Sequence, residues 1–570
     1  MKQIISILSL FSIVMLSAQE VDKDTIKTEE VNIIKPYTPQ IKDAFKIKAK
    51  PVINKDTLSI KKEVDYSISS FPVASTFTPS KGKAKGVSQK KRERVFENYI
   101  DAGFGNYITP KIEAFAHSST TRDNDFGAKL KYHSSNGGLK EVQLDNDFMN
   151  AGIEAYYTKS VDNFDWKATI GYQYQKQNWY GLTKNNALTD VQIANIESKQ
   201  VYNGFDIGGN IKYYDANFKG SDVNFSIFTD AYNSSEFHFL LKPQFEFLLL
   251  GEWTDVDLRV EYINGGFDKN YIDTNSLEYG YFNAGISPKV KIIRDFFTVN
   301  IGANLVYTSA LKNNGLSAFF IYPNITANYE LIQDVVTVYA GVTGDLHQHS
   351  YQNFANKNTY VSPTLNIGRT NEMYHAKLGF KGKVASNVSF NINASYKDEN
   401  GKFLFKLNDE LAPATAANYQ YANSFKVVYD NVATIGFFGE LNYDYSKEIR
   451  LGGSVNYNIY NTEKQDDVWN LPTLNTAIFA KYDAKKIIAG VDLFLVGETK
   501  DQYFDTALSL VKITNKAFVD LNVNLGYRVT NRLSAYINGN NLLGKNYQRY
   551  TNYKVQGIQV LGGIKYKFDL

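Results

Sequence analysis

The chain has 570 residues, of which 41 are Tyr and 37 are Phe, and its net charge is only +3. A mean hydropathy of -0.34 excludes a polytopic helical membrane protein but allows a β-barrel, because polar lumenal residues dilute the apolar signal. The small net charge gives no reason to expect nucleic-acid binding. The absence of cysteine excludes disulfides, thiolate metal sites and a cysteine nucleophile.

Residues 1–19 are predicted to be a secretory signal peptide. Lys2 precedes an apolar run over residues 4–16, and the small residues Ser17 and Ala18 supply a cleavage site. The run is too short to span a bilayer as a helix, and a buried N-terminal helix is the alternative. No other stretch approaches about 18 consecutive apolar residues, so no transmembrane helix is predicted.

Residues 20–95 are predicted to be an extended basic periplasmic segment or a filler of a lumen. They contain 17 Lys and Arg against 10 Asp and Glu, and five of the 12 prolines of the chain. Residues 81–94 form a strongly basic linker. This basic run could contact anionic headgroups or an acidic partner, and a solvated linker is the alternative.

Residues 96–570 are predicted to form a single large antiparallel transmembrane β-barrel, an all-β fold of about 22 strands within a range of 20 to 24. Alternating runs of roughly ten to fifteen residues are separated in turn by tight turns and by longer polar loops. An even number of strands is required if the N-terminal segment and the C-terminus both lie in the periplasm, as expected here. The predicted tight turns are residues 162–163, 219–220, 294–295, 333–334, 386–387, 446–447, 484–485 and 530–531. The predicted external loops are residues 178–198, 265–275, 347–371, 401–419, 460–471, 498–514 and 541–555.

The last stretch of the chain is predicted to close this barrel. Ile564, Tyr566 and Phe568 fall on one face of an extended strand, whereas Lys565 and Lys567 fall on the other. Residues 518–538 show the same division, with an aliphatic face opposite Asp, Asn and Arg residues. A soluble core would rarely accept so polar a sheet face, but a lumen opposite lipid requires one.

The C-terminal region resembles the TonB-dependent outer-membrane receptors. Residues 537–547 (Ile-Asn-Gly-Asn-Asn-Leu-Leu-Gly-Lys-Asn-Tyr) and 562–568 (Gly-Gly-Ile-Lys-Tyr-Lys-Phe) are similar to the penultimate strand, loop and closing strand of that family. Residues 363–365, Glu372 and residues 378–382 are similar to its mid-barrel loop and descending strand. The resemblance implies an outer membrane of a Gram-negative bacterium, contact with its lipid and insertion by its barrel-assembly machinery.

The plug domain of that family is missing from the sequence. Thr28, Glu29, Glu30, Val31 and Ile33 resemble the short stretch before the plug, which implies possible coupling to a periplasmic energy-coupling protein. Only about 60 residues then precede the first barrel strand, too few and too polar for the plug. An unfilled barrel of this size would leave a wide hole. The N-terminal segment, inward-folded loops or a partner protein must therefore fill it.

No motif predicts an enzyme, and no cofactor is expected. His347 and His349 lie on one side of an extended chain and could bind a transition metal, with a solvated loop as the alternative. Trp179, Tyr180 and Trp469 lie in predicted external loops, where their rings could stack on a ligand or a sugar. The alternative for these three rings is packing between loops or in the interface girdle.

The sequence therefore favours solute transport across the outer membrane, with external loops that select the solute. The alternative is a sealed scaffold barrel that docks periplasmic or outer-membrane partners, such as a surface lipoprotein. A polar lumen suits both hypotheses.

Overall fold

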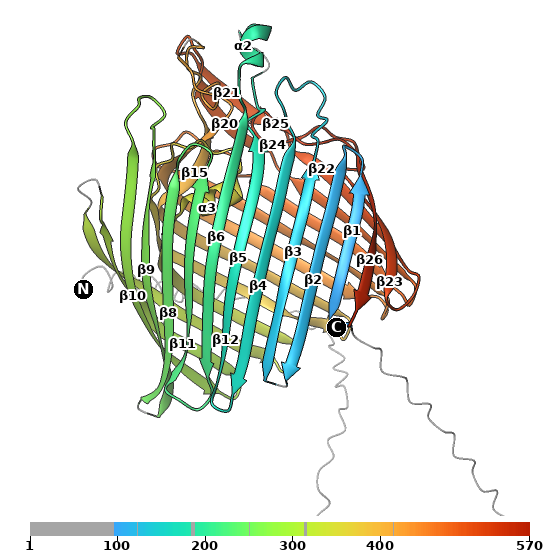
Figure 1. Cartoon of the computed structure of the whole chain (residues 1–570). Coiled ribbons are helices and arrows are strands. Elements are labelled where there is room, and N and C mark those ends of the chain that lie inside the picture. The colour runs from blue at the N-terminus through green and yellow to red at the C-terminus, as the bar shows by residue number, and fades with distance from the viewer. Residues whose placement is uncertain are drawn as a thin grey trace, which may run out of the picture. The chain divides into compact units, whose positions relative to one another are not determined.

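The computed structural model describes residues 96–121, 123–183, 188–249, 251–312, 316–413 and 415–569. The predicted signal peptide, the basic segment and the coupling residues Thr28, Glu29, Glu30, Val31 and Ile33 lie outside these residues. The chain divides into two units after Lys90, and the described residues all belong to the second. They form a closed antiparallel barrel of 22 strands (Figure 1), as predicted.

The barrel strands follow one another around the wall in chain order. They are β1 (Asn98–Gly105), β2 (Thr109–Thr121), β3 (Asn124–Ser135), β4 (Phe148–Val161), β5 (Phe164–Asn178), β6 (Lys199–Tyr213), β7 (Phe218–Asp230), β8 (Ser235–Leu249), β9 (Glu252–Phe267), β10 (Leu277–Arg294), β11 (Phe297–Ala310), β12 (Ser317–Ile332), β13 (Val336–Gln348), β14 (Arg369–Ala385), β15 (Val388–Leu407), β16 (Phe425–Asp444), β17 (Ile449–Thr462), β18 (Leu474–Asp483), β19 (Ile487–Val496), β22 (Phe518–Arg528), β23 (Leu533–Asn540) and β26 (Gln559–Phe568). The loops add the hairpins β20 (Thr499–Phe504) with β21 (Leu510–Asn515) and β24 (Gln548–Tyr550) with β25 (Tyr553–Lys554), and the helices α2 (Asp190–Ala194) and α3 (Tyr351–Lys357).

Strand β26 closes the barrel by pairing with both β23 and β1. Ile564 lies opposite Ala102 on one side and Ala535 on the other, and Phe568 lies opposite Asn98. Because β1 and β26 are antiparallel, the described chain enters and leaves the barrel at the same end. The side chains of Ile564 and Tyr566 are exposed, as expected for residues that face lipid.

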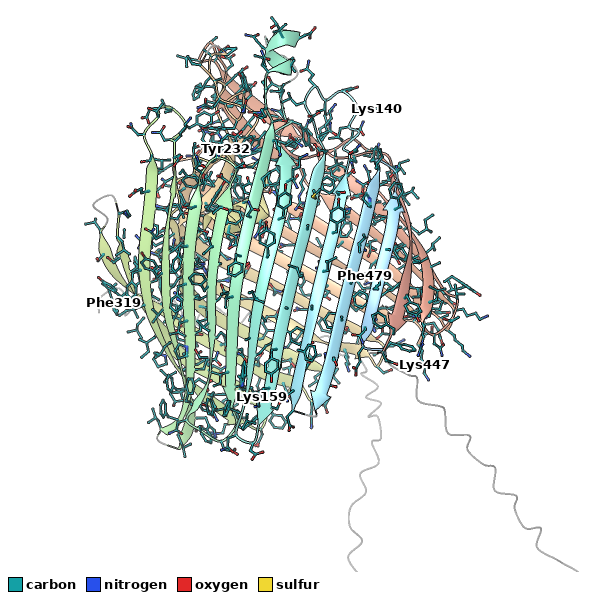
Figure 2. The ribbon with its side chains drawn as sticks, in the orientation of Figure 1. Lys140, Lys159, Tyr232, Phe319, Lys447 and Phe479 are labelled. Carbon is teal, nitrogen blue, oxygen red and sulfur yellow. The ribbon has the colours of Figure 1, made fainter. Side chains whose placement is uncertain are left out.

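The wall has an apolar outer face and a polar inner face. Large apolar side chains recur at every second position and remain exposed, among them Ile153, Ile207, Ile325, Leu378, Ile435 and Leu525. Figure 2 shows Phe319 on the outer surface, Lys159 and Lys447 at one end, and Lys140 at the other. No helix among the described residues is long and apolar enough to cross a membrane.

The two ends of the barrel differ as the sequence predicts, with tight turns at one and long loops at the other. One predicted turn is wrong: Lys219 and Gly220 lie inside β7, and the connection from β6 to β7 is residues 214–217. The register between β7 and β8 shifts between Phe218 and Gly220. The glycine therefore belongs to a β-bulge, which has a similar sequence signal to a turn. At the opposite end, α2 rises above the wall (Figure 1).

Candidate functional site

The loop between β13 and β14, residues 349–368, folds into the barrel mouth, and we call it the cap loop. Its helix α3 lies within the barrel outline near the long-loop end (Figure 1). Tyr351 and Phe354 are completely buried. The ring of Tyr351 lies 5.2 Å from that of Phe228 on β7 and 4.9 Å from that of Phe267 on β9. The largest apolar core among the described residues therefore lies at one end of the lumen, where cap-loop residues pack against side chains of the barrel strands.

Two carboxylates on the β7–β8 hairpin hold the start of α3. Glu236, buried at the start of β8, accepts hydrogen bonds from the backbone N–H groups of Tyr351 at 2.5 Å and Gln352 at 3.1 Å. It also accepts one from the hydroxyl of Tyr279 at 2.7 Å. Asp230 accepts a hydrogen bond from the hydroxyl of Tyr351 at 2.7 Å. Negative charge at a helix N-terminus satisfies its free N–H groups and favours the helix dipole.

The second half of the cap loop crosses to β10 and β16. Val361 forms a parallel bridge with Phe425, whose carbonyl accepts the N–H of Ser362 at 2.9 Å. The hydroxyl of Tyr281 on β10 donates to the carbonyl of Ile367 at 2.9 Å. The N–H of Gly368 donates to the hydroxyl of Tyr429 on β16 at 2.6 Å. The cap loop is thus attached to several strands of the wall and spans the mouth between them.

Aromatic residues of the neighbouring loops complete the closure. The rings of Tyr360 and Tyr553 stack at 3.6 Å, and Tyr180 donates to the carbonyl of Lys554 at 2.9 Å. Trp179 is fully buried, 5.5 Å from the ring of Tyr419. Burial raises the pKa values of the Tyr180 and Tyr553 phenols well above the ordinary value for tyrosine, so both side chains remain neutral. These rings join loops to one another.

Trp469, the third aromatic candidate, lies in a separate cluster. It is buried against Leu404 and Val432, and its indole N–H donates to the side chain of Gln465 at 2.7 Å. The ammonium group of Lys406 lies 5.1 Å from its ring. Trp469 thus lies in a different apolar cluster from Tyr180, and both tryptophans are buried.

His347 and His349 occupy different surroundings. His349 is buried, with its Nε2 atom 2.7 Å from the hydroxyl of Thr370 and its ring 4.7 Å from that of Phe403. Burial lowers the pKa of His349 to about 3, so its imidazole is neutral. His347 instead lies 3.5 Å from the carboxylate of Glu372. The described residues contain no group of three or more His, Asp or Glu side chains that could hold a metal ion.

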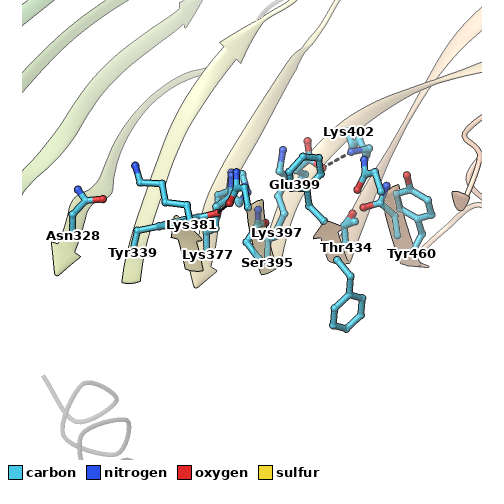
Figure 3. Close-up of a pocket in the computed structure, with 18 residues that line it drawn as sticks. Asn328, Tyr339, Lys377, Lys381, Ser395, Lys397, Glu399, Lys402, Thr434 and Tyr460 are labelled. Atoms are coloured by element: carbon cyan, nitrogen blue, oxygen red, sulfur yellow. Dashed lines mark hydrogen bonds and ion pairs between the residues drawn. The ribbon is translucent and has the colours of Figure 1, made fainter. Parts of the chain in front are cut away.

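A cavity of about 660 Å³ opens on the lumen wall formed by β12 to β17. Lys377, Lys381, Lys397 and Lys402 line it and are called here the lysine wall. Figure 3 shows these lysines beside one another along the strands, interleaved with Asn, Ser and Tyr side chains. Lys402 forms an ion pair with Glu399. The lumen wall at this cavity is thus polar and locally basic.

These features define the class of the molecule, a large β-barrel with an apolar outer face and a polar lumen, closed at its mouth by loops. No family model and no curated protein matches the sequence. Its fold is nevertheless that of the barrel of TonB-dependent receptors, as the C-terminal residues predicted. Similar solved structures include the FrpB iron transporter (F5-1 variant) from Neisseria meningitidis, with 11% identity, 83% of this chain and 82% of that chain covered, and a TM-score of 0.64.

Two further structures give the same result. The siderophore receptor PirA from Acinetobacter baumannii has 12% identity and a TM-score of 0.60, with 83% of this chain and 80% of that chain covered. The pyoverdine outer membrane receptor FpvA from Pseudomonas aeruginosa PAO1 has 12% identity and a TM-score of 0.57, with 84% and 79% covered. At these identities the likeness establishes the barrel fold alone.

The sequence predictions missed the two features that organise the site. Glu236 is one lumenal carboxylate among many, and nothing in its local sequence indicates the partner 115 residues later. The lysine wall is only weakly indicated by the sequence, in which Lys377, Lys381 and Lys383 share one face of a predicted strand. Counting the charged residues on each face of every predicted strand would have detected it.

Proposed function

We propose that this protein transports a solute across the outer membrane and that the cap loop is its gate. The observation that carries the proposal is the attachment of a single folded segment, by Glu236, across the mouth of a polar lumen. Displacement of that segment, together with separation of the loops that pack on it, opens the mouth without breaking any pairing between barrel strands. The similar barrels of an iron transporter and of siderophore receptors support transport as the class of function.

In this proposal the tight-turn end faces the periplasm and the cap loop faces the medium. The entry and exit of the described chain at the tight-turn end support that orientation. Residues 20–95 then extend into the periplasm or fill part of the lumen from below. Residues 28–33 are the proposed contact for a periplasmic energy-coupling protein that would help to displace the filling. The proposal includes no catalytic step and no cofactor.

Single-channel conductance in planar bilayers tests this function. The natural chain is expected to be closed, whereas a variant with residues 350–366 replaced by a short Gly-Ser linker is expected to conduct in large discrete steps. A second variant, lacking residues 20–95, reports whether that segment also obstructs the lumen. Glu278→Gln is the control substitution. Its carboxylate lies at the same barrel end as the cap loop, but it forms an exposed ion pair with Lys312 instead of holding that loop.

A sealed scaffold barrel is the second candidate, and the number of buried cap contacts favours it. Tyr351, Phe354, Val361 and Leu365 all have relative exposures of 1% or less, as in a permanent core. If neither the linker variant nor the variant lacking residues 20–95 conducts, gating has failed as an explanation. The barrel would then serve to dock a periplasmic protein or a surface lipoprotein.

A further inference from the structure

We propose that the lysine wall is a binding surface for anionic solutes, of the class that carries clustered carboxylate or phosphate oxygens. The proposal rests on the transport function above and names its substrate class. The cavity on β12 to β17 is lined by four lysines and by one acidic side chain, Glu399, which gives a net charge of +3 with histidine neutral. Such a charge concentrates anions in a confined lumen.

Two of the four positive charges are not neutralised by the protein. Lys402 pairs with Glu399, and Lys397 lies 3.2 Å from the carboxylate of Glu372. Among the described residues, Lys377 and Lys381 have no carboxylate partner. The ammonium group of Lys381 lies 5.7 Å from the ring of Tyr339. These two ammonium groups therefore retain the capacity to bind an anion from the lumen.

Neutral hydrogen-bonding groups stand between the lysines. They are the amides and hydroxyls of Asn391, Asn393, Ser395, Thr434, Asn456 and Asn458. The hydroxyl of Thr434 is buried without a hydrogen-bond partner among the described residues. Amide N–H and hydroxyl groups together with ammonium groups form the donor set that carboxylate and phosphate oxygens require.

The opposite wall has balanced charge. A cavity of about 680 Å³ there is lined by Lys111, Lys129 and Lys131 and by three acidic residues, Glu113, Glu154 and Asp206. Lys129 lies 4.0 Å from the carboxylate of Glu113. The excess of positive charge at the lysine wall is thus not shared by the opposite wall.

Basic residues continue from the lysine wall to the cap loop. Lys397 and Glu399 also line a cavity of about 460 Å³ beneath α3, together with Lys357 at the end of that helix. Lys357 lines a further cavity of about 290 Å³, which reaches Arg549 and Lys554 in the loops. The cavity beneath α3 also contains Glu261 and Glu372, so its four basic residues exceed its three acidic residues by one, whereas no acidic residue lines the cavity that reaches the loops.

The first arm of the test is equilibrium binding of pyrophosphate and of citrate to the full-length protein in detergent, measured by calorimetry. Loss of two ammonium contacts in Lys377→Gln/Lys381→Gln is expected to weaken binding about tenfold. The matched control is Lys129→Gln/Lys131→Gln, which removes the same charge from the balanced wall and is expected to bind as the natural chain does. A preference for one of the two probes identifies phosphate or carboxylate as the recognised group.

The second arm is the reversal potential of the linker variant under a KCl gradient. An about threefold preference for chloride is expected, and the lysine substitutions, but not the control pair, are expected to abolish it. The anion-site proposal is overturned, while transport stands, if the channel conducts without anion preference or if the lysine-wall and control substitutions change the preference equally. If no variant conducts, the transport proposal fails and the binding measurement alone tests the anion site. Equal binding by all variants then overturns the anion site, whereas loss of binding only in Lys377→Gln/Lys381→Gln upholds it.

Discussion

Glu236→Ala is expected to release the first turn of α3 from the barrel wall. The natural carboxylate accepts three hydrogen bonds of 3.1 Å or less, from the N–H groups of Tyr351 and Gln352 and from the hydroxyl of Tyr279. A buried donor without its acceptor costs about 1–3 kcal/mol. At about 1 kcal/mol for each donor, the low end of that range, we expect about 3 kcal/mol for the three donors together. That value corresponds to about a hundredfold larger open population.

Hydrogen–deuterium exchange of the amides of α3 (Tyr351–Lys357) measures this opening directly. Exchange is expected to accelerate about a hundredfold in Glu236→Ala and less in Glu236→Gln, which keeps one acceptor oxygen. Glu278→Ala, at the same end of the barrel, is expected to leave exchange in α3 unchanged. Unaltered exchange in Glu236→Ala, with an intact barrel, would refute the reasoning and assign the attachment of the helix to aromatic packing alone.

Three further predictions follow from contacts around the cap and the seam. Burial lowers the pKa of His349 to about 3, so the neutral imidazole contributes its full stability above about pH 6.5 and this stability is lost on acidification. At pH 5 the loss is about 2 kcal/mol, which faster hydrogen–deuterium exchange in the cap loop would detect. His349→Gln should remove this dependence of exchange on pH. Tyr553→Ala loses the stack on Tyr360 and is expected to destabilise the loops by about 3–5 kcal/mol, which limited trypsin digestion would detect. Ile564→Arg places a charge in lipid at a cost of about 2–4 kcal/mol and should lower the urea midpoint, whereas Lys565→Arg on the lumenal face should not.

The barrel wall could be predicted from the sequence because its signal is local. Alternation over residues 518–538 depends only on the two-residue period of a strand and on lipid opposite water, and β22 and β23 follow it. Loop lengths were also readable, since the predicted loop at residues 347–371 contains the observed cap loop. The misplaced turn at Lys219 and Gly220 shows the limit, because a bulge and a turn both use glycine.

The closure of the mouth could not be predicted because it depends on contacts between distant segments. Nothing near Trp179 indicates Tyr419, and nothing near Tyr360 indicates Tyr553. Aromatic residues in a loop suit a ligand and a neighbouring loop equally well. Three fillings of the barrel were expected: the N-terminal segment, inward-folded loops and a partner protein. Among the described residues, inward-folded loops close the mouth. The N-terminal segment and a partner protein remain proposals for the lower lumen.

The central claim is that the cap loop moves, and a reversible crosslink tests it most directly. A Cβ atom placed on Gly204 of β6 would lie 3.3 Å from the side-chain nitrogen of Gln352 on α3, and the natural chain has no cysteine to interfere. Gly204→Cys/Gln352→Cys, combined with Glu236→Ala and joined by a short cleavable thiol crosslinker, should be closed in planar bilayers and should conduct once the link is cleaved. Equal conductance before and after cleavage would contradict the cap loop as the gate.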